Sequence, residues 1–380
     1  MYFRDVIGHD QIIKRLISNV KNQRISHAQL LLGDQGNGTL ALALAYARYI
    51  QCRNRSGQDA CGVCPSCLKF NKYEHPDLHF YFPSAPNKEH KEKAKVSSKL
   101  FLNHWRKLLT TNTYFEYLDW LEAIGIENKQ AIINAEDCND IIRILGLKAY
   151  ESPYKIVVIY MVEKLSYQAA PKLLKILEEP PEGTLFLLIS ENKDRIINTI
   201  LSRTQILKVP RPEETALKQV LVEKHSLDPD FAGRIALMSG GVYTEAIKLA
   251  SGDEDQLADF NSFREWMRLC YKNEAGNILK WVEKTAQSGR EKQKSFCQYG
   301  LRVFRLCLLH NYKAGDLIKF EGEELDFLKK FSRFIHHNNA IAIVDAFNDA
   351  ISHIERNANP KILFADLSFK LHMLMHSKKA

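Results

Sequence analysis

The 380-residue sequence contains no long apolar segment. A membrane-spanning helix needs about 20 consecutive apolar residues, so no transmembrane segment is expected. The N-terminal residues MYFRDVIGHDQ carry charges and lack the apolar core of a secretory signal peptide. These two absences predict a cytoplasmic protein. The formal net charge of +8 suits a nucleic-acid or acidic partner, although an excess of this size is equally common on an ordinary solvated surface.

Lysine is also absent from residues 23–67, and this absence falls on the most distinctive motif of the chain. The segment Leu30–Leu40, LLLGDQGNGTL, reads as a buried strand, a glycine-rich turn and the start of an apolar helix over residues 41–50. This is the layout of a phosphate-binding loop, G-x-x-x-x-G-K-[ST], with Gly33 and Gly38 at the two glycine positions. An ordinary strand–turn–helix junction would give the same pattern.

The chemistry of a phosphate loop is missing from this segment. In a working loop, the lysine neutralises the β- and γ-phosphates, and the hydroxyl that follows it holds Mg²⁺. Here those positions hold Thr39 and Leu40. A threonine cannot replace an ammonium group, and a leucine cannot bind a metal. Gly33, Gly36, Gly38 and Thr39 are therefore predicted to form a degenerate phosphate loop that does not function.

Apolar strands and helices alternate up to about residue 210. The apolar segments at residues 155–159 and 185–189 are typical of strands buried in a parallel sheet, and residues 206–209 are also strand-like. The helix between the first two of these strands should begin late or bend, because Pro171 removes a backbone hydrogen-bond donor. The alternation predicts a doubly wound α/β domain.

After Pro212 the pattern becomes almost purely helical. Helices are expected at residues 213–225, 228–238, 242–251, 255–285, 291–313, 323–357 and 361–376. A chain of this length has room for two or three domains, and the change of pattern marks the end of the first one.

Four of the eight cysteines are clustered with the spacing C-x8-C-x2-C-x2-C. They are Cys52, Cys61, Cys64 and Cys67. Two-residue spacings let neighbouring thiolates converge on one ion, and four thiolates bind Zn²⁺ tetrahedrally. Because the protein would fill all four positions, we predict a structural zinc site; a coincidental cluster of core cysteines is the alternative. The other four cysteines lie among apolar residues and are interpreted as small core residues.

Several segments of the chain fit one family. They are GHDQIIKRLISNVKNQRISHAQLLLGDQGNGTL, the cysteine cluster, HPDL, KIVVIYMVEKLSYQAAPKLLKILEEPPEGTLFLLIS and TILSRTQIL. Together they resemble the bacterial clamp-loader family, the AAA+ proteins of the DNA polymerase III holoenzyme. The resemblance is dense over residues 3–82 and 131–250, whereas the C-terminal third agrees only in being helical.

The resemblance implies three domains and one insertion. An AAA+ domain of the P-loop, RecA-like type, carrying the zinc knuckle, would occupy residues 1–210. A small helical lid would follow over residues 211–252, and an all-α collar domain over residues 253–380. Residues 84–130 are an insertion relative to the usual spacing in the family. Local packing on the core and a partner-binding helical hairpin are both open roles for this insertion.

The resemblance also implies that ATP hydrolysis is lost. In active members an Asp-Glu pair follows the strand that matches residues 155–159, and this pair holds Mg²⁺ and activates the attacking water. Here those positions hold Tyr160 and Met161. The lid arginine of the family would fall near residues 242–245, which contain no arginine. We therefore expect that ATP is either not bound or not hydrolysed, as in the non-hydrolysing members of the family.

One catalytic element of the family is retained. Its members carry Ser-Arg-Cys where this chain has Ser202, Arg203 and Thr204. In the family this arginine projects into the ATP site of the neighbouring subunit, where it stabilises charge on the γ-phosphate as an arginine finger. Arg203, acting in trans, and Ser202 are thus the candidate catalytic residues. A surface salt bridge is the alternative role for Arg203.

Three functions follow from these observations. The first is a non-hydrolysing stator subunit of a clamp loader, with gamma/tau and delta subunits as partners, and with the sliding clamp and primed DNA reached through the complex. The second is an active, gamma/tau-like AAA+ ATPase with a degenerate phosphate loop. The third is a stand-alone zinc protein that binds nucleic acid.

Overall fold

The computed structural model describes residues 1–90, 96–126, 129–251, 254–312 and 323–377. These residues form two compact units, Met1–Ala246 and Ile247–Ala380. Residues 91–95 and 127–128 of the insertion, and the predicted boundary between lid and collar at residues 252–253, lie outside the described part of the chain. The division into three domains stays a prediction.

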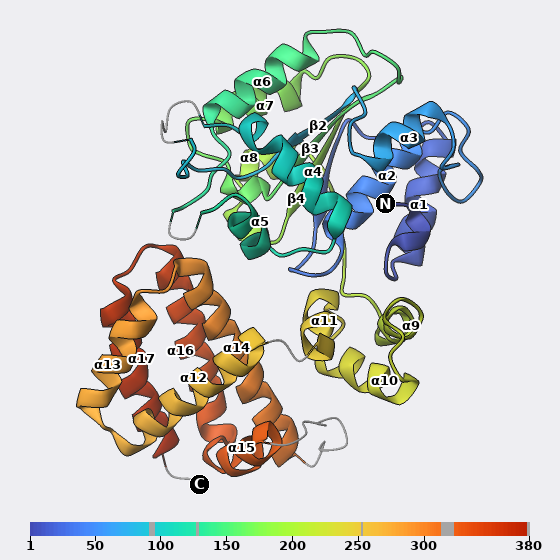
Figure 1. Ribbon diagram of the computed structural model, residues 1–380. Coiled ribbons are helices and arrows are strands. Elements are labelled where there is room, and N and C mark those ends of the chain that lie inside the picture. Colours follow the sequence, from blue (N-terminus) through green and yellow to red (C-terminus); the bar gives the residue numbers. More distant parts are fainter. Residues whose placement is uncertain (91–95, 127–128, 252–253, 313–322, 378–380) are drawn as a thin grey trace. The chain divides into compact units, whose positions relative to one another are not determined.

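A five-stranded parallel sheet organises the first unit (Figure 1). Its strands are β1 (Ala28–Leu32), β2 (Leu78–Tyr81), β3 (Lys155–Tyr160), β4 (Thr184–Ser190) and β5 (Gln205–Lys208). They lie in the order β2-β3-β4-β1-β5, and every neighbouring pair is parallel. All residues of β3 and β4 are buried, which explains why these strands read as continuous apolar segments.

Helices cover both faces of this sheet (Figure 1). One face carries α1 (Asp10–Lys21), α2 (Thr39–Gln51), α3 (Pro65–Asn71), α4 (Leu102–Thr111) and α5 (Tyr117–Ala123). The other face carries α6 (Ala135–Leu145), α7 (Ala170–Glu178) and α8 (Asn198–Leu201). Short 3₁₀ helices are η1 (Phe3–Asp5), η3 (Ser98–Phe101), η4 (Val162–Lys164) and η5 (Lys193–Arg195). The predicted doubly wound α/β domain of the AAA+ type is confirmed.

Local chemistry sets where these helices begin. The side chain of Asn134 caps α6 by accepting hydrogen bonds from the backbone amides of Glu136 and Asp137, at 2.9 and 3.1 Å. Helix α7 begins only at Ala170 and has Pro171 in its first turn, where the missing amide donor costs least. The late start predicted for this helix is confirmed.

The described part of the insertion packs on the core of the first unit. Trp105 of α4 and Trp120 of α5 are fully buried, and their ring centroids lie 5.0 Å apart. The indole nitrogen of Trp120 donates a hydrogen bond of 2.8 Å to the carbonyl oxygen of Pro83. Of the two roles left open for the insertion, local packing is therefore the one that its described residues adopt.

The helical part of the chain begins with α9 (Glu214–His225), α10 (Pro229–Met238) and α11 (Tyr243–Ser251). The second unit then contains α12 (Glu254–Lys272), α13 (Ala275–Ala286), α14 (Arg290–Asn311), α15 (Glu323–Phe331), η7 (Ser332–Phe334), α16 (His337–Glu355) and α17 (Pro360–Met375). Within the described ranges, no helix is both long and apolar enough to span a bilayer.

The prediction of a single long helix was wrong for two segments, because a turn divides each of them into two helices. The segment 255–285 breaks at Asn273, whose φ of 54° is left-handed, and α13 folds back so that the rings of Trp266 and Trp281 stack at 4.7 Å. The segment 323–357 breaks after η7, where His336 has an extended backbone and caps α16.

The four cysteines outside the cluster are fully buried, as predicted. They are Cys138, Cys270, Cys297 and Cys307. Each belongs to an apolar core, where burial raises the pKa of the thiol to about 12. These thiols therefore stay protonated at neutral pH and act as small apolar side chains.

Candidate functional site

The glycine-rich loop joins the carboxyl end of β1 to the amino end of α2. Gly36 and Gly38 have φ angles of 77° and 78°, a left-handed conformation that glycine adopts without strain. Between them, the side chain of Asn37 donates a hydrogen bond of 3.0 Å to the carbonyl oxygen of Val209. The Nε2 atom of His9 lies 2.8 Å from the carbonyl oxygen of Asn37. The strand–loop–helix layout predicted from the sequence is thus present, and both flanks of the loop are held.

Side chains of the same unit pack closely against this loop. A Cβ atom added to Gly36 would lie 2.4 Å from Cγ1 of Val242 and 3.0 Å from Oγ1 of Thr244. A Cβ atom added to Gly38 would lie 2.7 Å from the ring of Tyr114. Val242 and Thr244 stand where the family would place its lid arginine, so this position does adjoin the loop but brings no positive charge to it.

Tyr114 comes from the insertion and is buried beside the loop. Its hydroxyl oxygen accepts a hydrogen bond of 2.8 Å from the backbone amide of Ile7. Its ring lies 4.9 Å from that of Tyr243 and belongs to a small apolar cluster with Ile7 and Ala41. Burial raises the pKa of Tyr114 well above its usual value, so the hydroxyl stays neutral. The insertion, the N-terminal segment and α11 therefore meet at the phosphate-loop-like turn.

Aromatic rings surround the position where active relatives carry metal-binding carboxylates. Tyr160, the last residue of β3, is buried, and its ring lies 5.3 Å from Trp105 and 5.7 Å from Phe115. Met161, which follows it, is also buried and has a φ of 56°. A carboxylate at the place of Tyr160 would be enclosed by rings and cut off from water, which is costly for an unpaired charge.

Glu163 is the next acidic residue along the chain, and it is held in a structural contact. One of its carboxylate oxygens accepts a hydrogen bond of 2.9 Å from the backbone amide of Glu191. Burial raises the pKa of this carboxyl group. Glu163 therefore fixes the turn after β4.

The clustered cysteines converge on one point. The four Sγ atoms of Cys52, Cys61, Cys64 and Cys67 lie within 4.8 Å of one another. The sulfur of Cys52 is 3.5 Å from that of Cys61 and 4.0 Å from that of Cys64. Zinc–sulfur bonds of about 2.3 Å in a tetrahedron place sulfurs roughly 3.8 Å apart. The cluster is therefore shaped to hold a metal ion such as Zn²⁺.

Arg48, which was not predicted from the sequence, lies beside the cysteine cluster and contacts the backbone of Cys67. Its guanidinium is buried and donates hydrogen bonds to the hydroxyl of Tyr2 at 2.7 Å, to the carbonyl oxygen of Cys67 at 3.0 Å and to Asn71 at 2.5 Å. A fixed positive charge at this place favours a cluster of thiolates. The signal in the sequence is the single charged residue within the otherwise apolar α2 segment TLALALAYARYIQ.

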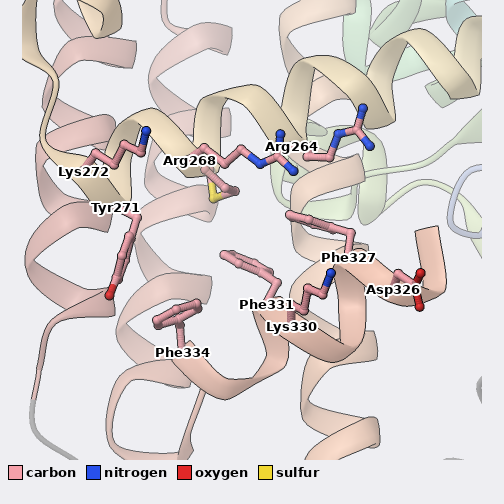
Figure 2. A pocket seen from close by; sticks show the side chains of 10 residues that line it. Arg264, Arg268, Tyr271, Lys272, Asp326, Phe327, Lys330, Phe331 and Phe334 are labelled. Atoms are coloured by element: carbon pink, nitrogen blue, oxygen red, sulfur yellow. The ribbon is translucent and has the colours of Figure 1, made fainter. Parts of the chain in front are cut away.

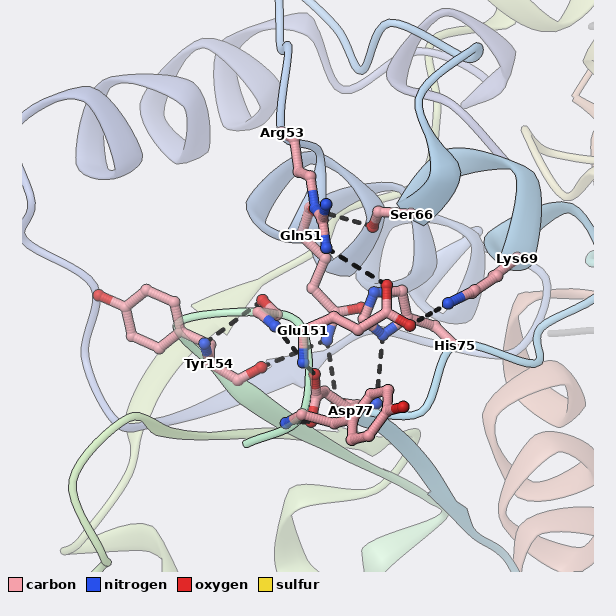
Figure 3. Close-up of polar contacts among 10 residues, drawn as sticks. Gln51, Arg53, Ser66, Lys69, His75, Asp77, Glu151 and Tyr154 are labelled. Carbon is pink, nitrogen blue, oxygen red and sulfur yellow. Dashed lines mark hydrogen bonds and ion pairs between the residues drawn. The ribbon is translucent and has the colours of Figure 1, made fainter. Parts of the chain in front are cut away.

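The HPD turn is an anchor between the cysteine module and the sheet (Figure 3). The carboxylate of Asp77 accepts hydrogen bonds of 2.7, 2.8 and 2.9 Å from the backbone amides of residues 150–152. Gln51, at the end of α2, donates to the carbonyl oxygen of Asp77 at 2.9 Å. Glu151 pairs in turn with Lys69 of α3. This network fixes the loop that leads into β3.

Arg203 lies at the amino end of β5, whereas the glycine-rich loop lies at the carboxyl end of the neighbouring parallel strand β1. It precedes β5, and Gln29 of β1 pairs with Gln205 in a parallel register. The loop instead follows the end of β1, so the two sites are separated by the length of these strands, roughly 13 Å at about 3.3 Å per residue. The Arg203 side chain is about one-third exposed and pairs with Glu178 at 2.5 Å. Ser202 accepts a hydrogen bond of 3.2 Å from it.

The structure thus brings the predicted site residues together in three separate places. The loop glycines and Thr39 form one group, the four cysteines a second, and Ser202 with Arg203 a third. Ser202 and Arg203 precede β5, whereas the loop follows the carboxyl end of the neighbouring strand β1.

Comparisons with known proteins agree with one family. The family model described as DNA polymerase III, delta subunit, matches residues 8–213. The delta' subunit of DNA polymerase III from Bacillus subtilis is 28% identical over 244 residues, which cover 64% of this chain and 60% of that protein. The delta' subunit from Escherichia coli is 27% identical over 243 residues, with the same coverage. The chain spans about three fifths of the length of these relatives.

Among solved structures, a gamma subunit-related protein of DNA polymerase III from Thermotoga maritima is similar over 96% of this chain and 99% of that chain, with 14% identity and a TM-score of 0.40. The family model covers more than half of the described chain, including the sheet, the glycine-rich loop, the cysteine cluster and Arg203. The chain therefore belongs to the DNA polymerase III delta subunit family, as a delta-prime-like member of the clamp-loader proteins.

Proposed function

We propose that this chain is the delta-prime-like stator of a DNA polymerase III clamp loader. It hydrolyses no ATP itself, assembles with gamma/tau and delta subunits, and supports the ATP-driven loading of a sliding clamp onto primed DNA. Arg203 acts in trans on the ATP bound by an adjacent gamma/tau subunit. The observation that carries this proposal is the separation of Arg203 from the loop of its own chain.

The absence of hydrolysis is supported by the surroundings of the loop. Tyr114 packs on Gly38 and Val242 packs on Gly36, so protein side chains already lie against the turn that would receive phosphates. Tyr160 stands among rings where metal-binding carboxylates are needed. With no lysine following Gly38, the loop also has no charge to offset a triphosphate.

The alternative of an active, gamma/tau-like ATPase is less well supported. It would require Mg²⁺ to be held without the two carboxylates after β3 and without a hydroxyl at Leu40. The family model that matches residues 8–213 is also described as that of the delta subunit, not as that of gamma or tau.

A structural role for zinc belongs to the same proposal. Cys52, Cys61, Cys64 and Cys67 would hold Zn²⁺, which would supply a rigid link between the end of α2 and the start of α3. The distances between their sulfurs suit such an ion. With four protein ligands the ion would have no open position for chemistry.

The test of this function is reconstitution. Purified gamma/tau and delta subunits from the same organism are assayed for ATP-dependent clamp loading on primed DNA, with and without this chain. We expect loading to require the chain, and the isolated chain to show no Mg²⁺-dependent ATP turnover. Turnover by the isolated chain would instead support the active-ATPase alternative.

A further inference from the structure

A cavity of about 400 Å³ lies within the second unit, between α12 and the segment formed by α15 and η7 (Figure 2). Its size falls in the range of pockets that hold small ligands or the anchoring side chains of a partner. The degenerate loop, the cysteine cluster and Arg203 all belong to the first unit, so this cavity is separate from the functions described above.

The interior of the cavity is apolar and aromatic. Tyr271 of α12 lies against Phe334 of η7, with ring centroids 4.6 Å apart. Phe327 and Phe331 of α15 stack at 5.1 Å with nearly parallel planes. Met267, which is almost completely buried, closes the interior. These side chains form a surface suited to an aliphatic or aromatic group.

The rim of the cavity is positively charged. Arg264, Arg268 and Lys272 recur every four residues along α12, so they share one face of the helix at intervals of about 6 Å. Lys330 adds a further cation from α15, and Asp326 is the single acidic residue of the lining. Four cations therefore stand against one carboxylate around an apolar interior.

Three cations of this rim, Arg268, Lys272 and Lys330, are exposed to solvent. Lys272 pairs with Glu274 at 3.5 Å, but both side chains are exposed, and water screens such a pair strongly. In the part of the chain that the structure describes, Arg268 and Lys330 form no ion pair, and both residues are exposed. An acidic partner would therefore displace little to reach them.

The contacts among the aromatic rings favour a peptide over a nucleic acid as the ligand of this cavity. Bases bind to proteins by stacking on open aromatic faces. Tyr271 already stacks on His376 at 4.7 Å and leans on Phe334, while Phe327 and Phe331 cover one another. These contacts cover one face of each ring, and an apolar side chain can pack against the remaining ring surface without the parallel geometry that a stacked base requires.

We propose that this cavity binds an acidic amphipathic helix of a partner protein. A large apolar side chain of that helix fills the cavity, and carboxylates one turn apart pair with Arg268, Lys272 and Lys330. The four-residue spacing of the cations matches that of carboxylates on one face of a helix. The apolar anchor supplies affinity and the charged rim supplies orientation.

Fluorescence anisotropy with the full-length chain tests this proposal. The probe is a labelled helical peptide of about 16 residues, built from alanine with leucines along one face and glutamates beside them. Two matched peptides carry glutamine in place of glutamate, or alanine in place of leucine. The variant Arg268→Glu combined with Lys330→Glu is compared with a control of equal charge change, Lys329→Glu combined with Arg305→Glu, at exposed positions outside the lining.

We expect saturable binding of the glutamate–leucine peptide. Each matched peptide, and the Arg268→Glu, Lys330→Glu variant, should bind at least about tenfold more weakly, a loss of about 1.4 kcal/mol, while the control variant binds normally. No saturable binding, or equal losses in the two variants, would overturn the proposal. Binding of labelled oligo(dT), but not of the peptide, that depends on Arg268 and Lys330 would assign the cavity to single-stranded nucleic acid and overturn it as well.

Discussion

Arg203 and Glu178 form an ion pair of 2.5 Å beside the turn that leads into β5. The guanidinium also donates a hydrogen bond of 3.0 Å to the carbonyl oxygen of Thr199. Both partners of the pair are partly exposed, at 34% and 48% of their side chains. Pairs of this kind contribute about 0–1 kcal/mol to the free energy of unfolding. Breaking the pair with Glu178, as the proposed contact with the phosphate of a bound nucleotide requires, therefore costs little.

The first prediction concerns this pair. Glu178→Gln should change the free energy of unfolding by less than about 1 kcal/mol, as measured by urea denaturation. Asp366→Asn, which breaks the exposed pair with Lys370 at 2.8 Å, is the matched control. A loss of several kcal/mol for Glu178→Gln alone would mean that Arg203 is a structural residue.

The second prediction concerns the residue that packs on the loop. Tyr114→Phe removes the hydroxyl that accepts the hydrogen bond of the Ile7 amide, and an unpaired buried amide costs about 1–3 kcal/mol. Tyr114→Ala should cost more, about 3–5 kcal/mol, because it also leaves a cavity. Neither variant should gain ATP turnover, since Tyr160 and Met161 are unchanged.

Chemical denaturation and an ATPase assay measure these effects. Tyr167→Phe, at a side chain that is 92% exposed, serves as the control and should leave stability unchanged. If Tyr114→Phe also left the free energy of unfolding unchanged, the hydrogen bond between Tyr114 and the Ile7 amide would contribute nothing to stability.

The third prediction concerns zinc. Metal analysis of the purified chain should find about one zinc ion per molecule. Cys61→Ser should lose this zinc and lower the melting temperature, because metal binding to the folded cluster stabilises the fold. Cys307→Ala, in the core of the second unit, should keep the zinc. A metal-free wild-type chain of unchanged stability would leave the four thiols as ordinary core cysteines.

The fourth prediction concerns pH. Burial raises the pKa of Asp137 to about 6, whereas an unfolded aspartate titrates near 3.9. Between about pH 4 and pH 6 the folded state therefore binds more protons than the unfolded state, so this group's contribution to stability falls as the pH rises. Two pH units correspond to at most about 3 kcal/mol.

The two carboxylate oxygens of Asp137 accept hydrogen bonds from the backbone amides of Ser98 and Asn134, at 2.8 and 3.0 Å. Asp137→Asn should remove the pH dependence, at the cost of one of these two hydrogen bonds at every pH. Urea denaturation at several pH values from 4 to 7 should show the variant gaining stability relative to the wild type as the pH rises. Parallel profiles for the two proteins would show that Asp137 keeps an ordinary pKa.

The sequence was sufficient for features that depend on neighbouring residues. The buried strands β3 and β4, the late start of α7 at Pro171 and the convergence of the cysteines all follow from local spacing, and the structure agrees with them. Strand β2 was missed, since it has only four residues, Leu78–Tyr81, and contains His79. Such a segment is shorter than a typical strand, so its pattern does not stand out from the surrounding loops.

Features that depend on distant contacts could not be predicted. Tyr114 packs on Gly38 of the loop and accepts a hydrogen bond from the amide of Ile7, 107 residues away, and no periodicity encodes these contacts. The break at Asn273 also depends on a tertiary contact, because the stacking of Trp266 on Trp281 rewards the reversal of direction. The three amide partners of Asp77 likewise lie more than 70 residues away along the chain.

The central claim is that Arg203 serves an ATP site on another chain, and one measurement tests it most directly. Clamp loaders are reconstituted from gamma/tau, delta and this chain, which carries either Arg203→Ala or the control Arg143→Ala, and ATP turnover is measured with clamp and primed DNA. We predict that both variants assemble, that Arg143→Ala keeps full activity, and that Arg203→Ala loses most of the stimulated turnover because the transition-state charge at one interface is no longer offset. Full stimulated turnover with Arg203→Ala in a correctly assembled complex would contradict the claim.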